Sequence, residues 1–226
     1  MVATPGADVP TPWQVMVFLH GSGERGPQDG SALWRVKVHG PWRAPGAERF
    51  LILAPQCSKD QTWPGLAKRV LAMTQSAFKR YPADTSSCCI TGLSMGAFGA
   101  WAVATQSPTV FRTVVPICGG YALPTLAPRT ELKDVVRLAK RDWEPRDVAG
   151  LKKVRAWMFH GSKDAVVSAK GSRQMYKALG GATRGRRMLR LTIFKGMGYH
   201  CWSRAYRTPK LLDWASPPSR KRNRAA

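Results

Sequence analysis

Acidic residues are scarce in this sequence. The chain has 226 residues, of which 13 are Asp or Glu and 36 are Lys or Arg, so its formal net charge is +23. A strongly basic chain can be attracted to nucleic acid, anionic lipid or acidic substrates. The basic residues are dispersed, with local concentration only in the ranges 184–190 and 220–224. We therefore expect nucleic acid or an anionic surface to be a secondary alternative among the partners.

Long apolar runs and metal-ligand motifs are also missing from the sequence. No stretch approaches the length of about 18 apolar residues that would span a bilayer, and no basic start followed by an apolar run opens the chain. The five cysteines form no C-x-x-C pair, and no His or carboxylate pair has the spacing of helix-borne metal ligands. We expect a cytoplasmic protein with reduced thiols, no transmembrane segment, no metal and no cofactor.

What the sequence does contain is an alternation of short apolar runs and longer helical stretches, which is typical of a mostly parallel sheet with helices on both faces. The predicted strands cover residues 15–19, 50–54, 87–91, 113–118, 154–159 and 188–194. The predicted helices cover residues 62–80, 95–106, 131–140, 168–179 and 202–214. This pattern predicts one α/β domain over residues 1–215 and a basic, disordered tail over residues 216–226. Residues 121–150 are less regular, and they form either a small lid or a connection.

One strand-to-helix junction carries a candidate nucleophile. Ser94 is the central residue of a G-x-S-x-G pattern, with an apolar strand before it and a helix of small residues after it. A tight turn of this kind holds the serine in a strained backbone conformation and lifts its hydroxyl above the sheet. The pentapeptide alone is a weak signal, because an ordinary turn serine has the same flanks.

Two further candidate catalytic residues follow later strands. Asp164 lies just after the predicted strand 154–159, and His200 follows the predicted strand 188–194 in a glycine-rich loop. Ligands and catalytic groups gather at the carboxyl ends of parallel strands, so all three candidates should meet at one sheet edge. The chain order Ser, Asp, His is that of the α/β-hydrolases and differs from the chymotrypsin and subtilisin orders.

A glycine-rich loop after the first long strand offers an oxyanion hole. The backbone N–H groups of Ser22, in this loop, and of Met95, which follows Ser94, are the candidate donors to a developing oxyanion. Gly21 and Gly23 of the same loop, together with Trp202 near His200, are candidate substrate-loop residues. Trp202 is more readily interpreted as a packing residue that holds the histidine loop down.

At this point the sequence resembles a known family. The segments FLHGSGERG (18–26), GLSMG (92–96), HGSKDAVV (160–167) and GMGYHCW (196–202) are together similar to the phospholipase/carboxylesterase group of α/β-hydrolases. That group includes the acyl-protein thioesterases, and similar motifs occur in dienelactone-hydrolase-like and polyhydroxybutyrate-depolymerase-like esterases. The resemblance implies an α/β-hydrolase fold with little or no cap, in which the antiparallel strands that often open the fold are short or missing.

The resemblance also implies an activity and residue roles. Ser94 would be the nucleophile, Asp164 the orienting acid and His200 the general base, with Ser22 and Met95 in the oxyanion hole. The expected reaction is cleavage of a carboxylic ester or thioester through an acyl-enzyme, on a small-molecule or lipid ester or an acyl-thioester. The alternatives are a serine peptidase on the same scaffold and a non-catalytic binding module whose basic surface holds an acidic partner.

Other residues compete for these roles. Asp142 or Asp147 could replace Asp164, which could instead be a helix cap or a loop carboxylate. His20 and His160 each precede a glycine at a strand end and are expected to brace loops through hydrogen bonds, and His39 has no partner pattern.

Three further expectations concern packing. Glu24 and Arg25 should form a structural ion pair, Cys88 and Cys89 should behave as small buried hydrophobes, and the scattered tryptophans should belong mostly to the core.

Overall fold

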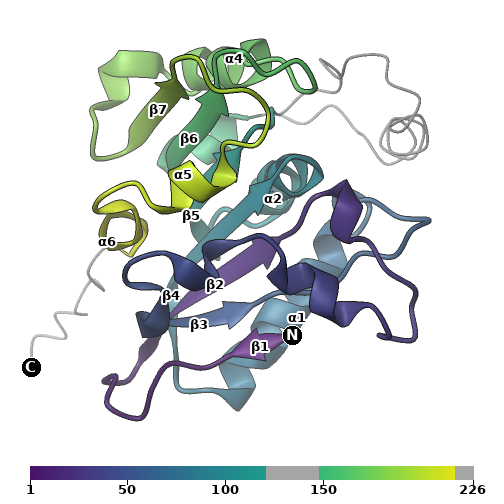
Figure 1. Cartoon of the computed structure of the whole chain (residues 1–226). Helices are drawn as coiled ribbons and strands as arrows, with labels where there is room; N and C mark the ends of the chain where they lie inside the picture. The colour runs from purple at the N-terminus through teal and green to yellow at the C-terminus, as the bar shows by residue number, and fades with distance from the viewer. Residues whose placement is uncertain (121–147, 217–226) are drawn as a thin grey trace, which may run out of the picture.

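The computed structural model describes residues 1–120 and 148–216. Residues 121–147 lie outside the described residues. They include most of the predicted lid or connection, its helix at 131–140, and the alternative acids Asp142 and Asp147. The basic tail at 217–226 also lies outside them. Within the described part, one twisted sheet of seven strands runs through the molecule (Figure 1).

The sheet has the order β1-β3-β2-β4-β5-β6-β7, and only β1 pairs antiparallel with its neighbour. Its strands are β1 (Val2–Ala3), β2 (Trp13–Leu19), β3 (Phe50–Leu53), β4 (Ala83–Leu93), β5 (Phe111–Ile117), β6 (Arg155–Gly161) and β7 (Leu189–Phe194). Six of these were predicted, with boundaries shifted by one to four residues. The single two-residue antiparallel strand agrees with the expectation that the opening strands are short.

Three longer helices cover one face of the sheet. They are α1 (Ala67–Arg80), α2 (Met95–Gln106) and α4 (Lys170–Ala178). Their apolar residues, including Val70, Trp101 and Met175, pack in one core cluster with the inward side chains of β2, β4 and β6. The α2 helix is buried on nearly all sides, because alanines and glycines let it lie directly on the strands.

Shorter elements cover the other face, where a second core cluster joins them to the strands. Two are the helices α5 (Trp202–Tyr206) and α6 (Leu211–Ala215), and three are the single-turn helices η2 (Leu33–Lys37), η3 (Pro41–Arg43) and η4 (Ala47–Arg49). The prediction of one continuous helix over 202–214 was wrong. Pro209 disfavours helical backbone at the residue before it, and Lys210 adopts a left-handed φ of 61°, so the helix breaks there.

The register of the parallel strands brings their carboxyl ends to one edge. Leu19 pairs with Gly92, Leu93 pairs with Ile117, and Gly161 pairs with Phe194. The residues that follow β2, β4, β5, β6 and β7 therefore share this edge, as expected for the candidate site. In residues 1–120 and 148–216, no helix is both long and apolar enough to cross a bilayer.

Candidate active site

Ser94 lies in a strained turn between β4 and α2. Its φ of 52° and ψ of −119° place it in a region that residues with a side chain rarely adopt, at a cost of roughly 1–3 kcal/mol. The Ser94 N–H donates to the Ile117 carbonyl oxygen at 2.9 Å, and this bond holds the turn against the end of β5. Ser94 itself is 7% exposed. The predicted tight turn is thus present, with the serine at its apex.

The two glycines of the pattern are required by close backbone contacts. A Cβ atom on Gly96 would lie 1.9 Å from the Leu19 carbonyl oxygen, and a Cβ atom on Gly92 would lie 2.4 Å from the Gly96 carbonyl oxygen. Both contacts involve backbone atoms, which cannot move aside as a flexible side chain can. The G-x-S-x-G spacing therefore reflects how closely the start of α2 sits on the ends of β2 and β4.

The glycine-rich loop after β2 lies against this turn. A Cβ atom on Gly21 would lie 2.8 Å from Leu93 Cδ1, so the loop touches the residue that precedes Ser94. The N–H groups of Ser22 and Met95 donate to no other group within the part of the chain that the structure describes. These two donors are therefore available to a substrate oxygen.

His20 supports the loop, as predicted, and does not face the nucleophile. Its Nδ1–H donates to the Gly21 carbonyl oxygen at 2.6 Å, and its Nε2 accepts from the Cys57 N–H at 3.0 Å. Burial lowers the pKa of His20 to about 4. Both ring nitrogens are thus occupied by structural hydrogen bonds, and the ring is neutral at physiological pH.

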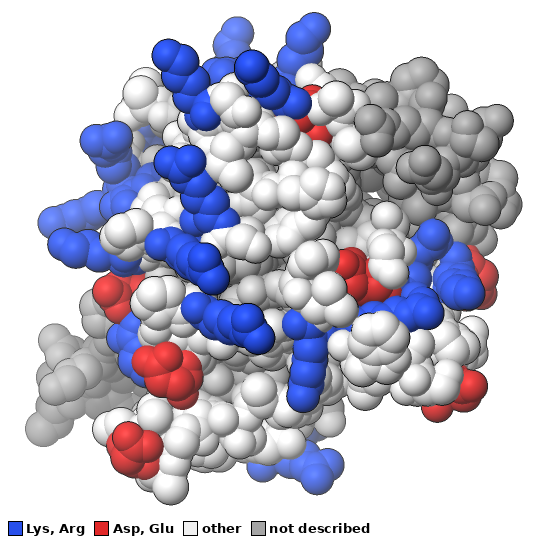
Figure 2. All heavy atoms as spheres, viewed as in Figure 1, with Lys and Arg blue, Asp and Glu red and all other residues white. Residues whose placement is uncertain are grey.

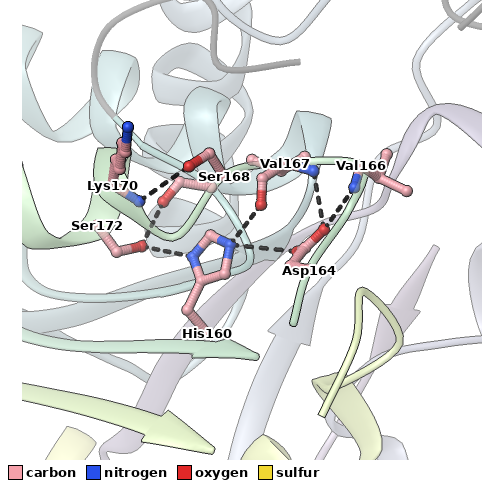
Figure 3. A network of polar contacts seen from close by, with 8 residues as sticks. His160, Asp164, Val166, Val167, Ser168, Lys170 and Ser172 are labelled. Carbon is pink, nitrogen blue, oxygen red and sulfur yellow. Dashed lines mark hydrogen bonds and ion pairs between the residues drawn. The ribbon is translucent and has the colours of Figure 1, made fainter. Parts of the chain in front are cut away.

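Asp164 is fixed by its own backbone turn and lies beside His160 (Figure 3). Its Oδ1 accepts the N–H groups of Val166 and Val167, each at 2.8 Å. The other oxygen, Oδ2, lies 3.2 Å from His160 Nε2, and both side chains are fully buried. His160 Nε2–H is directed to the Val167 carbonyl oxygen at 2.9 Å, while Nδ1 lies 2.8 Å from the Ser172 hydroxyl.

This arrangement leaves one carboxylate oxygen of Asp164 without a hydrogen bond. Oδ2 is buried, and no group in the described residues donates a hydrogen bond to it, because the nearby His160 N–H points to a carbonyl oxygen. A buried carboxylate oxygen without a donor is costly, by roughly 1–3 kcal/mol or more. Within the described residues Oδ2 therefore accepts no hydrogen bond, and the imidazole that lies beside it is that of His160.

His200 lies in the loop that follows β7, at the same edge of the sheet as the other two candidates. In the described residues no hydrogen bond joins His200 to Ser94 or Asp164. The imidazole is exposed and packs edge-on against Tyr199 and Trp202, with ring centroids 5.1 Å and 4.6 Å away. The preceding residue, Tyr199, packs against both His200 and Trp202, and burial raises the pKa of its hydroxyl.

Comparison with known proteins identifies the family. The sequence profile of the esterase family matches residues 35–207. The chain belongs to this esterase family. The prediction of a serine esterase with an α/β-hydrolase fold is confirmed at the level of family and fold. No curated protein sequence matches the chain.

Solved structures resemble the esterase over most of its length. The chain is similar to a thermostable esterase at 25% identity and a TM-score of 0.69, over 95% of this chain and 57% of that one. It therefore spans little more than half of that protein. Est1E from Butyrivibrio proteoclasticus, bound to ferulic acid, matches at 16% identity and a TM-score of 0.63, over 91% of this chain and 90% of its own. Pyrococcus horikoshii acylaminoacyl peptidase matches at 16% identity and a TM-score of 0.60, over 91% of this chain and 36% of its own.

An open pocket of about 580 Å³ lies over the site of the esterase. It is lined by the loop after β2, the residue before the nucleophile, the Asp164 loop and the histidine loop, namely Gly21, Ser22, Gly23, Glu24, His39, Leu93, Lys163, Ala165, Val166, Gly198, Tyr199, His200 and Trp202. Candidate substrate-loop residues Gly21, Gly23 and Trp202 all border it. Trp202 is 6% exposed and contacts the rings of both loop neighbours, as expected of a packing residue.

Glu24 and His39 form a pair in the pocket wall that the sequence did not reveal. Glu24 Oε1 lies 3.6 Å from His39 Nε2, and burial raises the pKa of the Glu24 carboxyl. The predicted ion pair between Glu24 and Arg25 was wrong, because the Arg25 guanidinium instead donates to the backbone oxygens of Ser22 and Lys59. His39 lies 15 positions after Glu24 in the sequence. No spacing rule pairs residues across such a stretch of loops and single-turn helices, so the sequence did not predict this contact.

In the described residues, no group of three or more His, Cys, Asp or Glu side chains is arranged to hold a metal ion. All five cysteines are buried and none forms a disulfide with another described residue, and Cys88 and Cys89 lie in the strand interior as predicted. The polar groups around the pocket are hydroxyl, imidazole, carboxylate and backbone N–H groups and the Lys163 ammonium group. These groups suit acyl transfer through a serine.

Proposed function

We propose that this esterase hydrolyses small carboxylic esters through an acyl-enzyme on Ser94. The observation that carries the proposal is the strained, glycine-flanked turn that holds Ser94 at the carboxyl edge of the sheet. Strain of this kind persists only where the surrounding structure enforces it, and it gathers at functional sites. The positive end of α2 at the same point favours negative charge on a substrate oxygen.

The proposed reaction uses His200 as the base and Asp164 as the orienting acid. The imidazole takes the Ser94 proton while Oγ attacks the ester carbonyl, and the N–H groups of Ser22 and Met95 stabilise the tetrahedral oxyanion. The imidazolium then returns the proton to the departing alcohol, which leaves an acyl-enzyme. Water attacks the acyl group and gives a proton to the imidazole. The imidazolium then passes that proton to the departing Ser94 oxygen, which releases the carboxylic acid and restores the free serine and the neutral imidazole.

The open acceptor on Asp164 supports this assignment of roles. An imidazole N–H donated to Oδ2 would satisfy a buried carboxylate oxygen and would hold the ring in the tautomer that accepts the serine proton. The exposed His200 ring borders the pocket at this edge of the sheet. His39, paired with Glu24, is the alternative imidazole in the pocket wall.

A fluorophosphonate probe tests the proposal most directly. The probe labels only an activated serine, so we expect one modified peptide that contains Ser94 and no labelling of the Ser94→Ala variant. Peptide mapping identifies the residue, and p-nitrophenyl esters of increasing acyl length then define the acyl preference. An intact protein that is neither labelled nor active on any ester would contradict the proposal.

Binding of a polyanion is a second candidate function, and it is favoured by the charge distribution. Lys and Arg side chains greatly outnumber acidic ones on the face shown in Figure 2. At the β7 edge, the Arg190 guanidinium lies over Trp157 and that of Arg155 over Trp214, at 4.5 Å and 4.4 Å from the ring centroids. Arg155 Nη1 is buried and has no hydrogen-bond partner in the described residues.

Salt dependence separates polyanion binding from chance adhesion. Polyanion binding at the β7 edge predicts that retention on heparin falls steeply as the salt concentration rises. It also predicts that the Arg190→Ala variant is retained less than the wild type. A matched control is Lys79→Ala, which removes one cation from the end of α1 instead. Equal retention of both variants would assign the binding to overall charge.

A further inference from the structure

A second hollow of about 500 Å³ adjoins the active-site pocket, and His39 lines both. We call this second hollow the side pocket. The His39 imidazole lies 3.6 Å from Glu24 Oε1 and packs against the Trp202 ring, with ring centroids 5.0 Å apart. Glu24 and Trp202 both line the active-site pocket. The side pocket therefore lies next to the pocket in which the ester is proposed to react.

The inner wall of the side pocket rests on strands that carry the site. Trp42, in this wall, packs edge-on against Phe18 of β2, with ring centroids 5.8 Å apart. Tyr206, also in the wall, shares a hydrogen bond of 3.0 Å with the hydroxyl of Thr91 in β4. Thr91 lies three residues before Ser94. The wall is thus fixed near the same strand ends as the nucleophile turn.

Three positively charged side chains line the side pocket, those of Lys37, Arg43 and Arg207. No Asp or Glu of the described residues is among its lining side chains. Within residues 1–120 and 148–216, none of the three cations forms an ion pair or a side-chain hydrogen bond. Arg49 in η4 differs, because its guanidinium pairs with the Asp213 carboxylate at 2.5 Å. The side pocket therefore gathers cations that the described fold does not use.

A hollow lined by charges of one sign attracts ions of the other sign. The walls focus the field and raise the local concentration of a counter-ion. A guanidinium group can bind both oxygens of a carboxylate, and a lysine ammonium adds a point charge. All three side chains are exposed, so each is expected to strengthen binding by only about 2-fold to 5-fold. Three together can produce a clear preference.

We propose, resting on the function proposed for Ser94, that the side pocket binds an anionic group of the ester substrate, such as a carboxylate. The preferred substrates are then esters with a negative charge in the acyl or the alcohol part. The charged end lies among the three cations while the ester carbonyl lies in the active-site pocket. The net charge of +23 attracts any anion, whereas the side pocket selects esters whose charge reaches it.

Matched pairs of esters test this preference. In the first pair, 4-nitrophenyl half-esters of dicarboxylic acids of increasing length are compared with the same compounds methylated at the free carboxyl. In the second pair, 4-acetoxybenzoate is compared with its methyl ester. Each kcat/KM is divided by the rate constant for hydrolysis by hydroxide, which removes differences in chemical reactivity. We expect the anionic member of at least one pair to be favoured about 10-fold or more, mainly through KM, and less so at high salt. Equal values within both pairs would overturn the proposal.

Two triple variants separate the side pocket from the overall charge. The side-pocket variant replaces its three cations, namely Lys37→Gln, Arg43→Gln and Arg207→Gln. The matched control removes the same charge from exposed positions of α1, namely Lys68→Gln, Arg69→Gln and Lys79→Gln. We expect the side-pocket variant to lower the preference for the anionic ester about 10-fold and the control to change it by less than about 2-fold. Equal losses in the two variants would assign the preference to overall charge and overturn the proposal.

Binding to Ser94→Ala separates failure of this proposal from failure of the proposed function. This variant cannot form an acyl-enzyme, so calorimetric titration with both ester pairs measures binding alone. Tighter binding of the anionic member, lost when the three side-pocket cations are also replaced, supports the side pocket whether or not the wild type hydrolyses esters. Equal binding within both pairs overturns it. A folded wild type that hydrolyses none of these esters and is not labelled by a fluorophosphonate shows instead that the function proposed for Ser94 is wrong.

Discussion

The nucleophile turn and the histidine loop meet at the same edge of the sheet but are held in different ways. Ser94 is buried, and flanking glycines whose places no side chain could take fix its backbone. His200 is exposed, and its ring packs against the rings of Tyr199 and Trp202. One half of the candidate site is therefore determined by close backbone packing, and the other half by contacts between side-chain rings.

This difference shows where the activity of such a site can be tuned. The turn tolerates almost no change, because its contacts are between backbone atoms. The histidine loop is held through the side-chain rings of Tyr199, His200 and Trp202, which can shift without altering the sheet. Substitutions in the turn should therefore remove activity or stability, whereas substitutions in the loop should adjust the rate in either direction.

The largest effect is expected from removal of the nucleophile. Ser94→Ala should lower kcat for p-nitrophenyl acetate by about 10³-fold or more, because no acyl-enzyme can form. Initial rates measured against enzyme-free buffer give this value. The matched control is Ser107→Ala at the opposite end of α2. Activity of Ser94→Ala equal to that of Ser107→Ala would exclude Ser94 from the reaction.

The choice of base gives the next largest effect. Loss of a general base typically costs about 10²-fold to 10⁴-fold. We expect His200→Ala to lower kcat in this range and His39→Ala to change it by less than about 5-fold. The kcat and KM values of the two variants, measured side by side, decide between the imidazoles. The reverse ranking would assign the base to the pair of His39 and Glu24.

A stability effect tests the steric account of the turn. Gly96→Ala should lower the free energy of unfolding by about 3 kcal/mol or more, since a methyl group would overlap the Leu19 carbonyl oxygen. Urea denaturation measures this change. Gly150→Ala is the control, because its nearest neighbour, Pro108 Cγ, lies at 3.9 Å. Equal stability of the two variants would show that the backbone can relax around the turn.

The loop behind the turn should make stability depend on pH. Burial lowers the pKa of His20 from 6.5 to about 4, so its contribution to stability is present above pH 6.5 and is lost as the pH falls toward 4. The unfolded chain binds the proton first, and the full effect is about 3 kcal/mol. The difference in unfolding free energy between the wild type and His20→Asn should narrow over this range. A difference that stays constant with pH would remove His20 as the cause.

The strand order and the positions of Ser94 and Asp164 were largely predictable because they depend on local patterns. Apolar runs of strand length predicted six of the seven strands, and the glycine spacing predicted the turn. The two-residue strand β1 is too short to carry a pattern. The break near Lys210 could have been read from Pro209, but the apolar periodicity on both sides masked it.

The contacts of the histidine loop could not be read from the sequence. Tyr199 and His200 are adjacent, both are polar aromatic residues, and both suit a site, so spacing does not say which one faces Ser94. The same holds for Glu24 and His39, whose contact joins two loops through the fold. Glycine and proline signals report on backbone shape and carry no information about such long-range neighbours.

The sequence by itself determined the parallel sheet, the strained serine turn and the common edge at which the candidate residues collect. These features follow from hydrophobic periodicity and from glycines that no other residue can replace, and both act over a few residues. Only the tertiary structure decided that Glu24 lies against His39 and that the His39 ring lies against Trp202. These contacts bring together segments that are far apart in the sequence, so they form only when distant strands have paired.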